Sequence, residues 1–456
     1  MPGRDAFRCC DALQSPLLND PRVISRFRFR GRLGAPLAGV LQLSGGSILS
    51  QLLAFATSLL VARLYTPEDL GGLAVVMAWA LLAAPFVTLG LQVMIVPAKT
   101  DADAVRLAQM ALSSTLVGVV VSAVLLSLIP TPSSHISGSK WLLVVVVPLM
   151  LMALGSFAVL SQLGLRQRLY GSIARRGVAQ NATIGIVQVG GFLVQKSSLW
   201  LVFGELVGRS VGALSLAPQA LRFFRAHAGS LPPWLDVLRR YKDAVRYFLP
   251  AMACEVATVQ LTVLLIARWY GAAEAGFLGL ANRVLTVPAA LVGAAVAQVL
   301  ATELARSRDS GRLSQSLPRL RHLALGLTLL GSLFATLVFV LGPWAFSVAF
   351  GDQWRDAGEL ARYLSFPIVV AIVWSPFSVV FATFYRLRTF VIISILRLGS
   401  AVWAGVVLHS VGCGWIATAV GMSVAIAAVE IVGLRFAWRL VAHEAAVEAK
   451  PESVDG

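Results

Sequence analysis

The sequence predicts an all-α polytopic membrane protein. It has about 12 transmembrane helices in two six-helix lobes related as repeats, with a cavity between the lobes. Three observations support this fold class. Apolar residues make up 57% of the 456 residues and charged residues only 13%, whereas a soluble domain carries about a quarter charged residues. Long apolar stretches recur along the whole chain, and a short segment of the first half recurs in the second.

Twelve apolar stretches are long enough to cross about 30 Å of hydrocarbon at 1.5 Å per residue. They cover residues 38–62, 71–93, 107–129, 141–163, 177–194, 199–217, 245–267, 276–300, 320–342, 360–382, 389–408 and 411–433. The fifth is the least apolar of the twelve, because it contains Gln180, Asn181, Thr183 and Gln188.

Basic residues predict how these spans are oriented. They concentrate before the first span and in the segments 163–176, 218–246 and 302–321. The positive-inside rule then places both termini in the cytoplasm. The net charge of +16 is therefore expected to orient the protein and to contact anionic membrane lipids rather than nucleic acid.

The predicted organisation has five parts, bounded by composition. Residues 1–37 form a cytoplasmic basic tail, which lacks the apolar core of a signal peptide. Residues 38–217 form an N-terminal lobe with spans 1–6, and residues 218–244 a cytoplasmic linker. Residues 245–433 form a C-terminal lobe with spans 7–12, and residues 434–456 a cytoplasmic tail.

The internal repeat relates the two lobes. Residues 62–71 read ARLYTPEDLG, and residues 267–276 read ARWYGAAEAG. Ala, Arg, Tyr and Gly are identical in the two copies, and Asp69 aligns with Glu274. Each copy ends one span and begins the next. Since each half has an even number of spans, the halves are expected to be parallel repeats, an architecture typical of transporters with a substrate route between the lobes.

Polar residues share one face in two corresponding spans. Ser44, Ser47, Gln51 and Ser58 lie on one side of the first span. Glu255, Thr258 and Thr262 follow the spacing i, i+3, i+7 in the seventh. Such faces either hydrogen-bond to neighbouring helices or line a cavity. The carboxylate of Glu255 favours a cavity and makes this residue the candidate for ion coupling.

Ionisable residues deep in spans are the strongest signal, because a charge at mid-bilayer costs roughly 2.5–3.5 kcal/mol. Arg209, Arg397 and Glu255 lie about 13–15 Å into their spans, and Arg283 about 10 Å. Glu430 lies only about 7 Å from the end of its span, so its side chain is expected to extend to the interface.

These positions give the candidates for substrate binding. Arg397 has no partner on its own helix and is the first choice for an anion contact, followed by Arg283. Arg209 stands four residues after Glu205, so it is either neutralised by that pair or faces substrate. An excess of cations predicts an anionic head group such as a phosphate or pyrophosphate. The substrate-binding candidates are Arg397, Arg283, Arg209, Asn282, Gln51 and Asn181.

Two further patterns concern packing and catalysis. Gly204, Gly208 and Gly212 form a row that predicts close packing against another helix. Asp101 and Asp103 match a DxD pattern, but they begin a span and are expected to cap its helix. The sequence contains no GxxxxGK[ST] or HExxH motif, and its one GxSxG match, Gly208–Gly212, lies within the glycine row of the sixth span rather than at a turn after a strand. It therefore predicts a non-enzyme without metal, cofactor or ATP site, for which an ion gradient remains as an energy source.

The segment from Ser44 to Val96 resembles the opening of the Wzx-type oligosaccharide flippases, polysaccharide transporters of the multidrug/oligosaccharidyl-lipid/polysaccharide superfamily. The resemblance rests on the Gly- and Ser-containing first span, the turn Arg63–Gly71 and the acidic stretch 99–104. In the second half, residues 275–277, Asn282-Arg283-Val284 and Pro288 resemble the family's eighth helix. Size, span count and six-plus-six layout agree along nearly the whole chain.

The resemblance implies a multi-pass protein of the bacterial inner membrane that flips undecaprenyl-pyrophosphate-linked oligosaccharide repeats. The product would be O-antigen, capsule or exopolysaccharide, and a polysaccharide polymerase and assembly proteins would be partners. It also implies that cationic cavity residues contact the pyrophosphate or acidic sugars. Two alternatives remain: a cation-coupled multidrug or toxin antiporter of the same fold, and a non-transporting scaffold of a glycan assembly complex.

Overall fold

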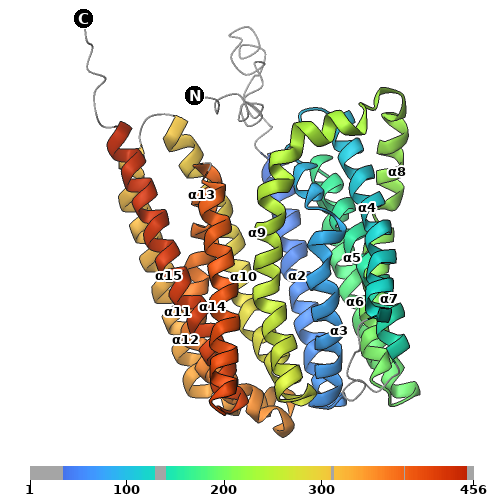
Figure 1. Cartoon of the computed structure of the whole chain (residues 1–456), viewed down its shortest axis with the longest axis vertical. Helices are drawn as coiled ribbons and strands as arrows, with labels where there is room; N and C mark the ends of the chain where they lie inside the picture. The colour runs from blue at the N-terminus through green and yellow to red at the C-terminus, as the bar shows by residue number, and fades with distance from the viewer. Residues whose placement is uncertain (1–33, 129–139, 310–312, 385, 449–456) are drawn as a thin grey trace, which may run out of the picture.

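The computed structural model describes the backbone of residues 34–128, 140–309, 313–384 and 386–448. Within these ranges the chain is helical throughout, with no strand, and its long helices run side by side along one axis (Figure 1). The predicted all-α fold is therefore confirmed.

Twelve long helices in the described ranges follow the twelve predicted spans in order. The first half contains α2 (Gly34–Leu64), α3 (Pro67–Val87), α4 (Asp101–Leu128), α5 (Lys140–Arg166), α6 (Tyr170–Val194) and α7 (Leu199–Leu214). The second half contains α9 (Trp234–Trp269), α10 (Ala272–Asp309), α11 (Leu313–Phe350), α12 (Arg355–Phe377), α14 (Leu387–Ser410) and α15 (Trp415–Glu448). The remaining short elements are α8 (Ala217–Ala226), α13 (Val379–Thr383), η4 (Leu91–Met94), η5 (Ala228–Ser230) and η6 (Asp352–Trp354).

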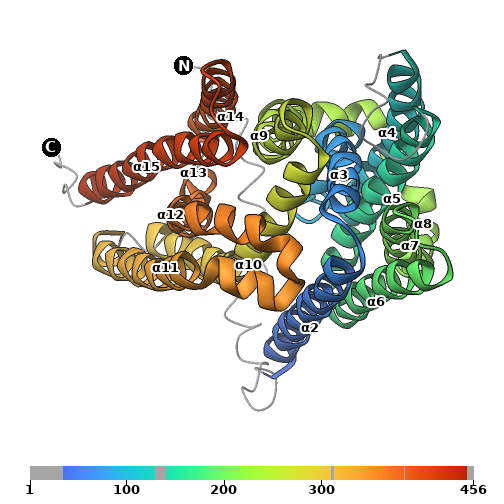
Figure 2. The same cartoon turned by 90° about the horizontal axis from the view of Figure 1, so that it is seen from below.

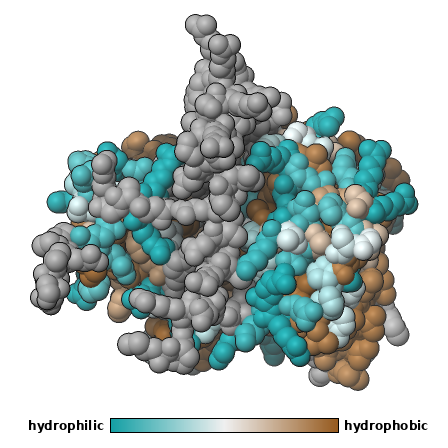
Figure 3. Space-filling view, turned by 90° about the horizontal axis from the view of Figure 1, so that it is seen from above, coloured by the Kyte–Doolittle hydropathy of each residue, from teal (hydrophilic) through white to brown (hydrophobic). Residues whose placement is uncertain are grey.

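Length and composition show that these helices suit a membrane. Among the described residues, 10 helices are long and apolar enough to cross one, and Ile48–Leu64 of α2 is a shorter apolar helix. Large apolar side chains point outward, for example Val117 at 63% exposure, Leu329 at 71% and Trp403 at 69%. Hydrophilic residues instead gather on the end of the bundle where α2 begins and α15 ends (Figure 3).

The helices pack as two groups. Helices α2–α7 contact one another, and α9–α15 contact one another. The groups meet chiefly where α3 packs against α10 and α9, seen along the bundle axis in Figure 2. The repeat symmetry between the halves stays a prediction.

The repeated segment forms the turn from α2 to α3. The Thr66 side chain accepts the Asp69 N–H, and the Asp69 carboxylate accepts the Thr66 N–H, while Pro67 occupies the first turn. This capping box satisfies backbone donors that a helix start leaves unpaired. The buried Tyr65 hydroxyl donates to the Gln188 carbonyl of α6 at 2.8 Å, so the turn is anchored within the first group.

The two copies of the repeat also meet each other. A Cβ added to Gly71 would lie 1.7 Å from the Ala272 carbonyl oxygen, and one added to Gly276 would lie 2.1 Å from the Pro67 carbonyl oxygen. Gly71 and Gly276 are equivalent in the repeat, and so are Pro67 and Ala272. The contacts are therefore reciprocal, and only glycine allows α3 and α10 to approach this closely.

Hydrogen bonds between helix ends close the same end of the bundle. Arg63 Nε donates to the Ala349 carbonyl at 2.9 Å and Arg63 Nη2 to the Val348 carbonyl at 2.8 Å, at the end of α11. In return, the buried Trp354 donates from Nε1 to the Ala62 carbonyl of α2 at 2.6 Å. The last carbonyls of a helix have no hydrogen-bond donor within that helix. Each helix group therefore supplies donors for the terminal carbonyls of a helix in the other group.

Candidate functional site

A cavity of about 620 Å³ lies between the two helix groups. Residues from α3, α7, α9, α10, α12, α14 and α15 line it. Four of the six substrate-binding candidates are among them, namely Arg209, Asn282, Arg283 and Arg397. We call this space the central cavity.

Helix α7 contributes an ion pair to the central cavity. Arg209 Nη2 lies 2.9 Å from Glu205 Oε2, as the i, i+4 spacing predicts. The glycine row of α7 packs against α6, where a Cβ on Gly208 would lie 2.3 Å from the Ile184 side chain. This close packing was expected from the spacing of the three glycines. Because the glycine side of α7 contacts α6, the Glu205–Arg209 pair lies on the side of α7 that lines the cavity.

Arg283 on α10 is exposed in the central cavity. Its Nη2 donates to the Ala54 carbonyl of α2 at 3.3 Å. No carboxylate of the described residues forms an ion pair with it. Arg283 also lines a smaller pocket of about 160 Å³, which shares Glu205 with the central cavity and extends to Leu70 and Gly276 near the closed end.

Arg397 on α14 has two carboxylate partners. Its Nη2 lies 2.8 Å from Glu430 Oε1 of α15, and its Nη1 contacts Glu255 Oε1 of α9. Ser394 donates to the same Glu255 oxygen at 3.1 Å. The guanidinium also lies over the Trp374 ring, with Cζ 5.8 Å from the centroid.

Glu430 corrects one expectation from the sequence. It was expected to extend to the membrane interface, but it is only 2% exposed. Because burial of an unpaired carboxylate is costly, its contact with Arg397 explains why it stays inside.

The lining of the central cavity holds one more cation than anions. Three arginines and two glutamates line the central cavity, since Glu205 accompanies Arg209 and Glu430 accompanies Arg397, whereas Glu255, the second partner of Arg397, lies outside the lining. The balance is uneven in space. Arg283 forms no ion pair with a described carboxylate, although Glu205 lies near enough to interact with it electrostatically, whereas the Glu255–Arg397–Glu430 group holds two carboxylates for one guanidinium.

The other two candidates lie elsewhere. Gln51 and Asn181 line a separate pocket of about 310 Å³ between α2, α5 and α6. The Asn181 amide donates to the Ser50 carbonyl and hydroxyl, both at 2.8 Å, so it joins α6 to α2. Arg176 lies in this pocket as well, although the sequence placed it at the end of a cytoplasmic loop.

The hydroxyl groups of the predicted polar faces bond locally. Ser58 donates to the Phe55 carbonyl at 2.7 Å and Thr258 to the Cys254 carbonyl at 2.7 Å, each within its own helix. Thr258 nevertheless lines the central cavity. The side chains of Ser44 and Ser47 lie outside the described residues.

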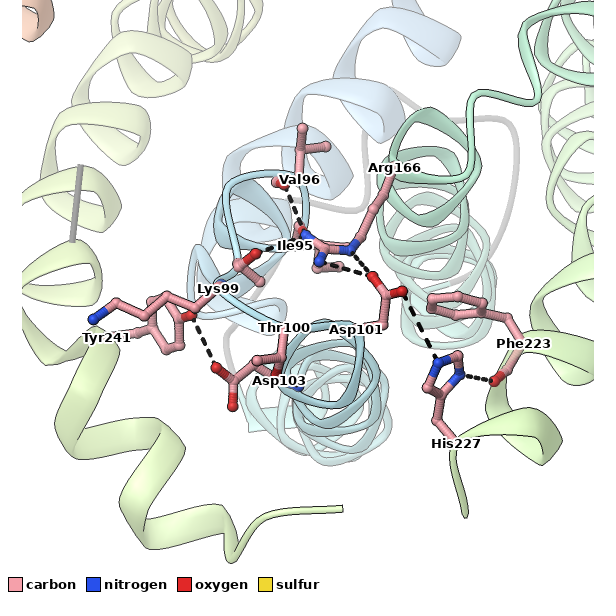
Figure 4. A network of polar contacts seen from close by, with 11 residues as sticks. Ile95, Val96, Lys99, Thr100, Asp101, Asp103, Arg166, Phe223, His227 and Tyr241 are labelled. Carbon is pink, nitrogen blue, oxygen red and sulfur yellow. Dashed lines mark hydrogen bonds and ion pairs between the residues drawn. The ribbon is translucent and has the colours of Figure 1, made fainter. Parts of the chain in front are cut away.

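The DxD residues belong to a polar network at the start of α4 (Figure 4). The Thr100 hydroxyl accepts the Asp103 N–H at 3.1 Å, so Thr100 supplies this cap rather than either aspartate, both of which lie in the first turn of α4. Asp103, 2% exposed, contacts Arg240 Nη1 at 2.7 Å, and Asp101 contacts Arg166 Nη2 at 2.8 Å. Because arginines of α5 and α9 neutralise both carboxylates, this cluster fastens the start of α9 to the first helix group.

Solved structures share the whole fold. A MATE-family multidrug transporter of the MOP superfamily in an inward-facing conformation superposes with a TM-score of 0.68 at 14% identity, covering 90% of this chain and 100% of that chain. The lipid II flippase MurJ in an inward closed conformation gives 0.65 at 13% identity, covering 89% of each. A MOP-superfamily transporter from Pyrococcus furiosus, described as having a binding pocket of reverse polarity, gives 0.60 at 10%, covering 90% and 95%.

Sequence comparison supplies the family. A search of the curated proteins finds no match. The family model described as "Polysaccharide biosynthesis protein" matches residues 60–359, which include the repeated segment, α7, α10 and α11. The chain therefore belongs to this polysaccharide biosynthesis family and has the fold of the MOP-superfamily transporters.

Proposed function

We propose that this protein carries undecaprenyl-pyrophosphate-linked oligosaccharide repeats from the inner to the outer leaflet of the bacterial inner membrane. The repeats would serve O-antigen, capsule or exopolysaccharide biosynthesis. Family membership supports a role in polysaccharide biosynthesis, and the fold supports transport. The observation that carries the proposal is the convergence of charged residues from both halves on the central cavity.

Arg283 is the contact we assign to the pyrophosphate. A guanidinium presents several N–H donors in a plane and binds phosphate through paired hydrogen bonds. Arg209 and Arg397 form ion pairs with carboxylates. Among the described residues, Arg283 donates a hydrogen bond only to the Ala54 carbonyl, at 3.3 Å. An anion entering the cavity therefore gains most at Arg283, with Asn282 beside it.

The Glu255–Arg397–Glu430 group is the site we assign to ion coupling. Two carboxylates sharing one guanidinium leave one negative charge, which a proton or a metal cation would neutralise. Glu255 is the more accessible of the two, with its side chain 35% exposed, against 2% for Glu430. Glu255 is therefore the residue expected to exchange the ion with its surroundings, whereas Glu430 lines the central cavity.

Alternating access follows from the closed end. With the predicted orientation, the α2–α3 and α9–α10 turns face outward, so the described conformation has its outer end closed. Outward opening would then separate Gly71 from Ala272 and Arg63 from the end of α11. Transport would alternate between this conformation and one in which these contacts are broken.

Export of surface polysaccharide in cells that depend on this chain tests the proposal. Arg283→Gln should abolish export, and Arg321→Gln should not, because Arg321 is exposed on α11 and does not line the cavity. A non-transporting scaffold predicts instead that neutralising Arg209, Arg283 and Arg397 together leaves export intact.

The antiporter alternative is favoured by one observation, the surplus carboxylate near Arg397. An antiporter would accumulate or expel a cationic dye in response to a proton or sodium gradient, and Glu255→Gln would stop this exchange. Dye exchange without polysaccharide export would replace the flippase proposal by the antiporter.

A further inference from the structure

A second pocket lies inside the first helix group. It has a volume of about 310 Å³ between α2, α5 and α6, and it shares no lining residue with the central cavity. Its polar wall consists of Ser50, Gln51, Arg176, Gln180 and Asn181, with the Phe157 ring opposite. We call it the Arg176 pocket.

Arg176 carries a charge that its surroundings do not neutralise. Nη1 donates to the Ser161 hydroxyl, and Cζ lies 4.0 Å from the centroid of the Phe157 ring. Nε is buried and has no hydrogen-bond partner. None of the carboxylates that the structure describes forms an ion pair with this guanidinium, which stays protonated at any ordinary pH.

A buried donor without a partner and a half-buried charge without a counter-charge both cost free energy. One water could accept from Nε, but it would not compensate the charge. An anionic oxygen would do both. Arg176 also lies only about 9 Å along α6 from its first residue, at 1.5 Å per residue, so the pocket is nearer the end of the bundle where α2 begins.

Two neighbours give the pocket a fixed wall and a free polar group. Asn181 is held by Ser50 of α2, as described above, and a Cβ on Gly177 would lie 2.9 Å from the Ser50 hydroxyl, so α2 and α6 are tightly joined here. Gln51 is exposed in the pocket. Its amide can both donate to and accept from hydroxyl groups.

The pocket adjoins the central cavity through Ala54. Ala54 lines the Arg176 pocket, and its carbonyl accepts from Arg283, which lines the central cavity. Arg283 therefore stands between the two spaces. A ligand bound by Arg283 of the second helix group therefore has another cation, Arg176, in the first helix group.

We propose that the Arg176 pocket is a second anion subsite for the transported molecule. It binds a carboxylate or phosphate oxygen through Arg176 and neighbouring hydroxyls through Gln51, while Arg283 binds the pyrophosphate. The inference rests on the proposed function, because it assigns the two cations to two parts of one substrate. Acidic sugars of the repeat and phosphate substituents share this chemistry.

Binding of small probes to the purified full-length protein tests the subsite. Glucuronate, inorganic phosphate and glucose are titrated by calorimetry against the wild type, Arg176→Gln and the matched control Arg175→Gln. Arg175 is the neighbouring arginine, is exposed, and donates only to the Gly171 carbonyl of its own helix. We expect Arg176→Gln to weaken the preferred anion at least tenfold, and Arg175→Gln and glucose binding to show no such change.

Comparison of the two anions shows which part of the transported molecule the Arg176 pocket binds. Loss confined to glucuronate assigns the pocket to an acidic sugar, and loss confined to phosphate assigns it to a phosphate substituent. Unchanged binding of both anions in Arg176→Gln overturns the subsite. If Arg176→Gln does not fold, Arg176→Met gives the answer, because it removes the charge and the donors but keeps an unbranched apolar stem; wild-type affinity there overturns the subsite as well.

Transport separates this inference from the proposed function. A lipid-linked repeat with only neutral sugars should still be flipped by Arg176→Gln but not by Arg283→Gln. If no lipid-linked repeat moves in the wild type, the proposed function fails. If Arg283→Gln abolishes transport while Arg176→Gln leaves anion binding unchanged, the proposed function stands and only the subsite is refuted.

Discussion

The contact between the two copies of the repeat gives the sharpest structural prediction. In Gly71→Ala, the new Cβ would lie 1.7 Å from the Ala272 carbonyl oxygen, whereas ordinary contact begins at 3.4 Å. The α3 and α10 backbones must therefore separate by at least the difference, 3.4 − 1.7 = 1.7 Å. The opposing atom is a backbone oxygen, so no side-chain rotation can relieve the clash.

The expected cost is that of overpacking a close interface, about 1–3 kcal/mol. The adjacent Gly72 is a matched control, because a Cβ there would meet nothing within 4 Å. Gly72→Ala should be neutral or stabilising by up to about 1 kcal/mol, since alanine favours the helix. Gly71→Ala should therefore unfold several degrees below Gly72→Ala, at roughly 2–4 °C per kcal/mol.

Two measurements check this prediction. Thermal unfolding of the purified protein in detergent, followed by gel filtration, compares the variants. In a background without native cysteines, a thiol reagent added from the closed end should label Ser58→Cys faster when Gly71→Ala is also present, because Ser58 lines the small pocket near that end. Equal stability and equal labelling in Gly71→Ala and Gly72→Ala would refute the close contact.

Four further substitutions test other contacts. Trp354→Phe removes the donor to the Ala62 carbonyl but keeps an aromatic ring. It should therefore lower the free energy of unfolding by about 0.5–1.5 kcal/mol. A decrease below a tenth of that would show that this hydrogen bond does not stabilise the protein. Asp103→Asn should lower the free energy of unfolding by about 1–3 kcal/mol, because its carboxylate is buried. Asp101→Asn should lower it by under about 1 kcal/mol, because the Asp101 side chain is 52% exposed. Thermal unfolding that finds Asp101→Asn the less stable variant would contradict this reasoning. Glu255→Gln should make transport insensitive to a proton or sodium gradient while the protein stays folded, and an unchanged gradient dependence in vesicles would remove Glu255 from the coupling site.

The helices could be predicted from the sequence because hydropathy and length depend on neighbouring residues of the chain. The Glu205–Arg209 pair and the packing of the glycine row on another helix were predictable for the same reason, since both follow from spacing on one helix. Arg209, Arg283 and Arg397 were recognised by depth and Asn282 as the neighbour of Arg283, and all four line one cavity.

Contacts between helices were not predictable in this way. The partners of Arg397 come from α9 and α15, so a search of its own helix could not find them. Glu430 was judged by its distance from the end of its span, which says nothing of a guanidinium on a neighbouring helix. Arg176 was assigned to a loop because the first residues of this helix are polar, so that hydropathy begins the span only at residue 177. In the structure α6 begins earlier, at Tyr170.

The central claim is that this chain moves a lipid-linked oligosaccharide between leaflets. Leaflet accessibility of an undecaprenyl-pyrophosphate-linked repeat in inverted membrane vesicles, with and without the protein, tests it most directly. We expect protein-dependent movement that Arg283→Gln abolishes and Arg321→Gln preserves. No movement for a panel of native lipid-linked glycans, or movement that survives Arg283→Gln unchanged, would contradict it.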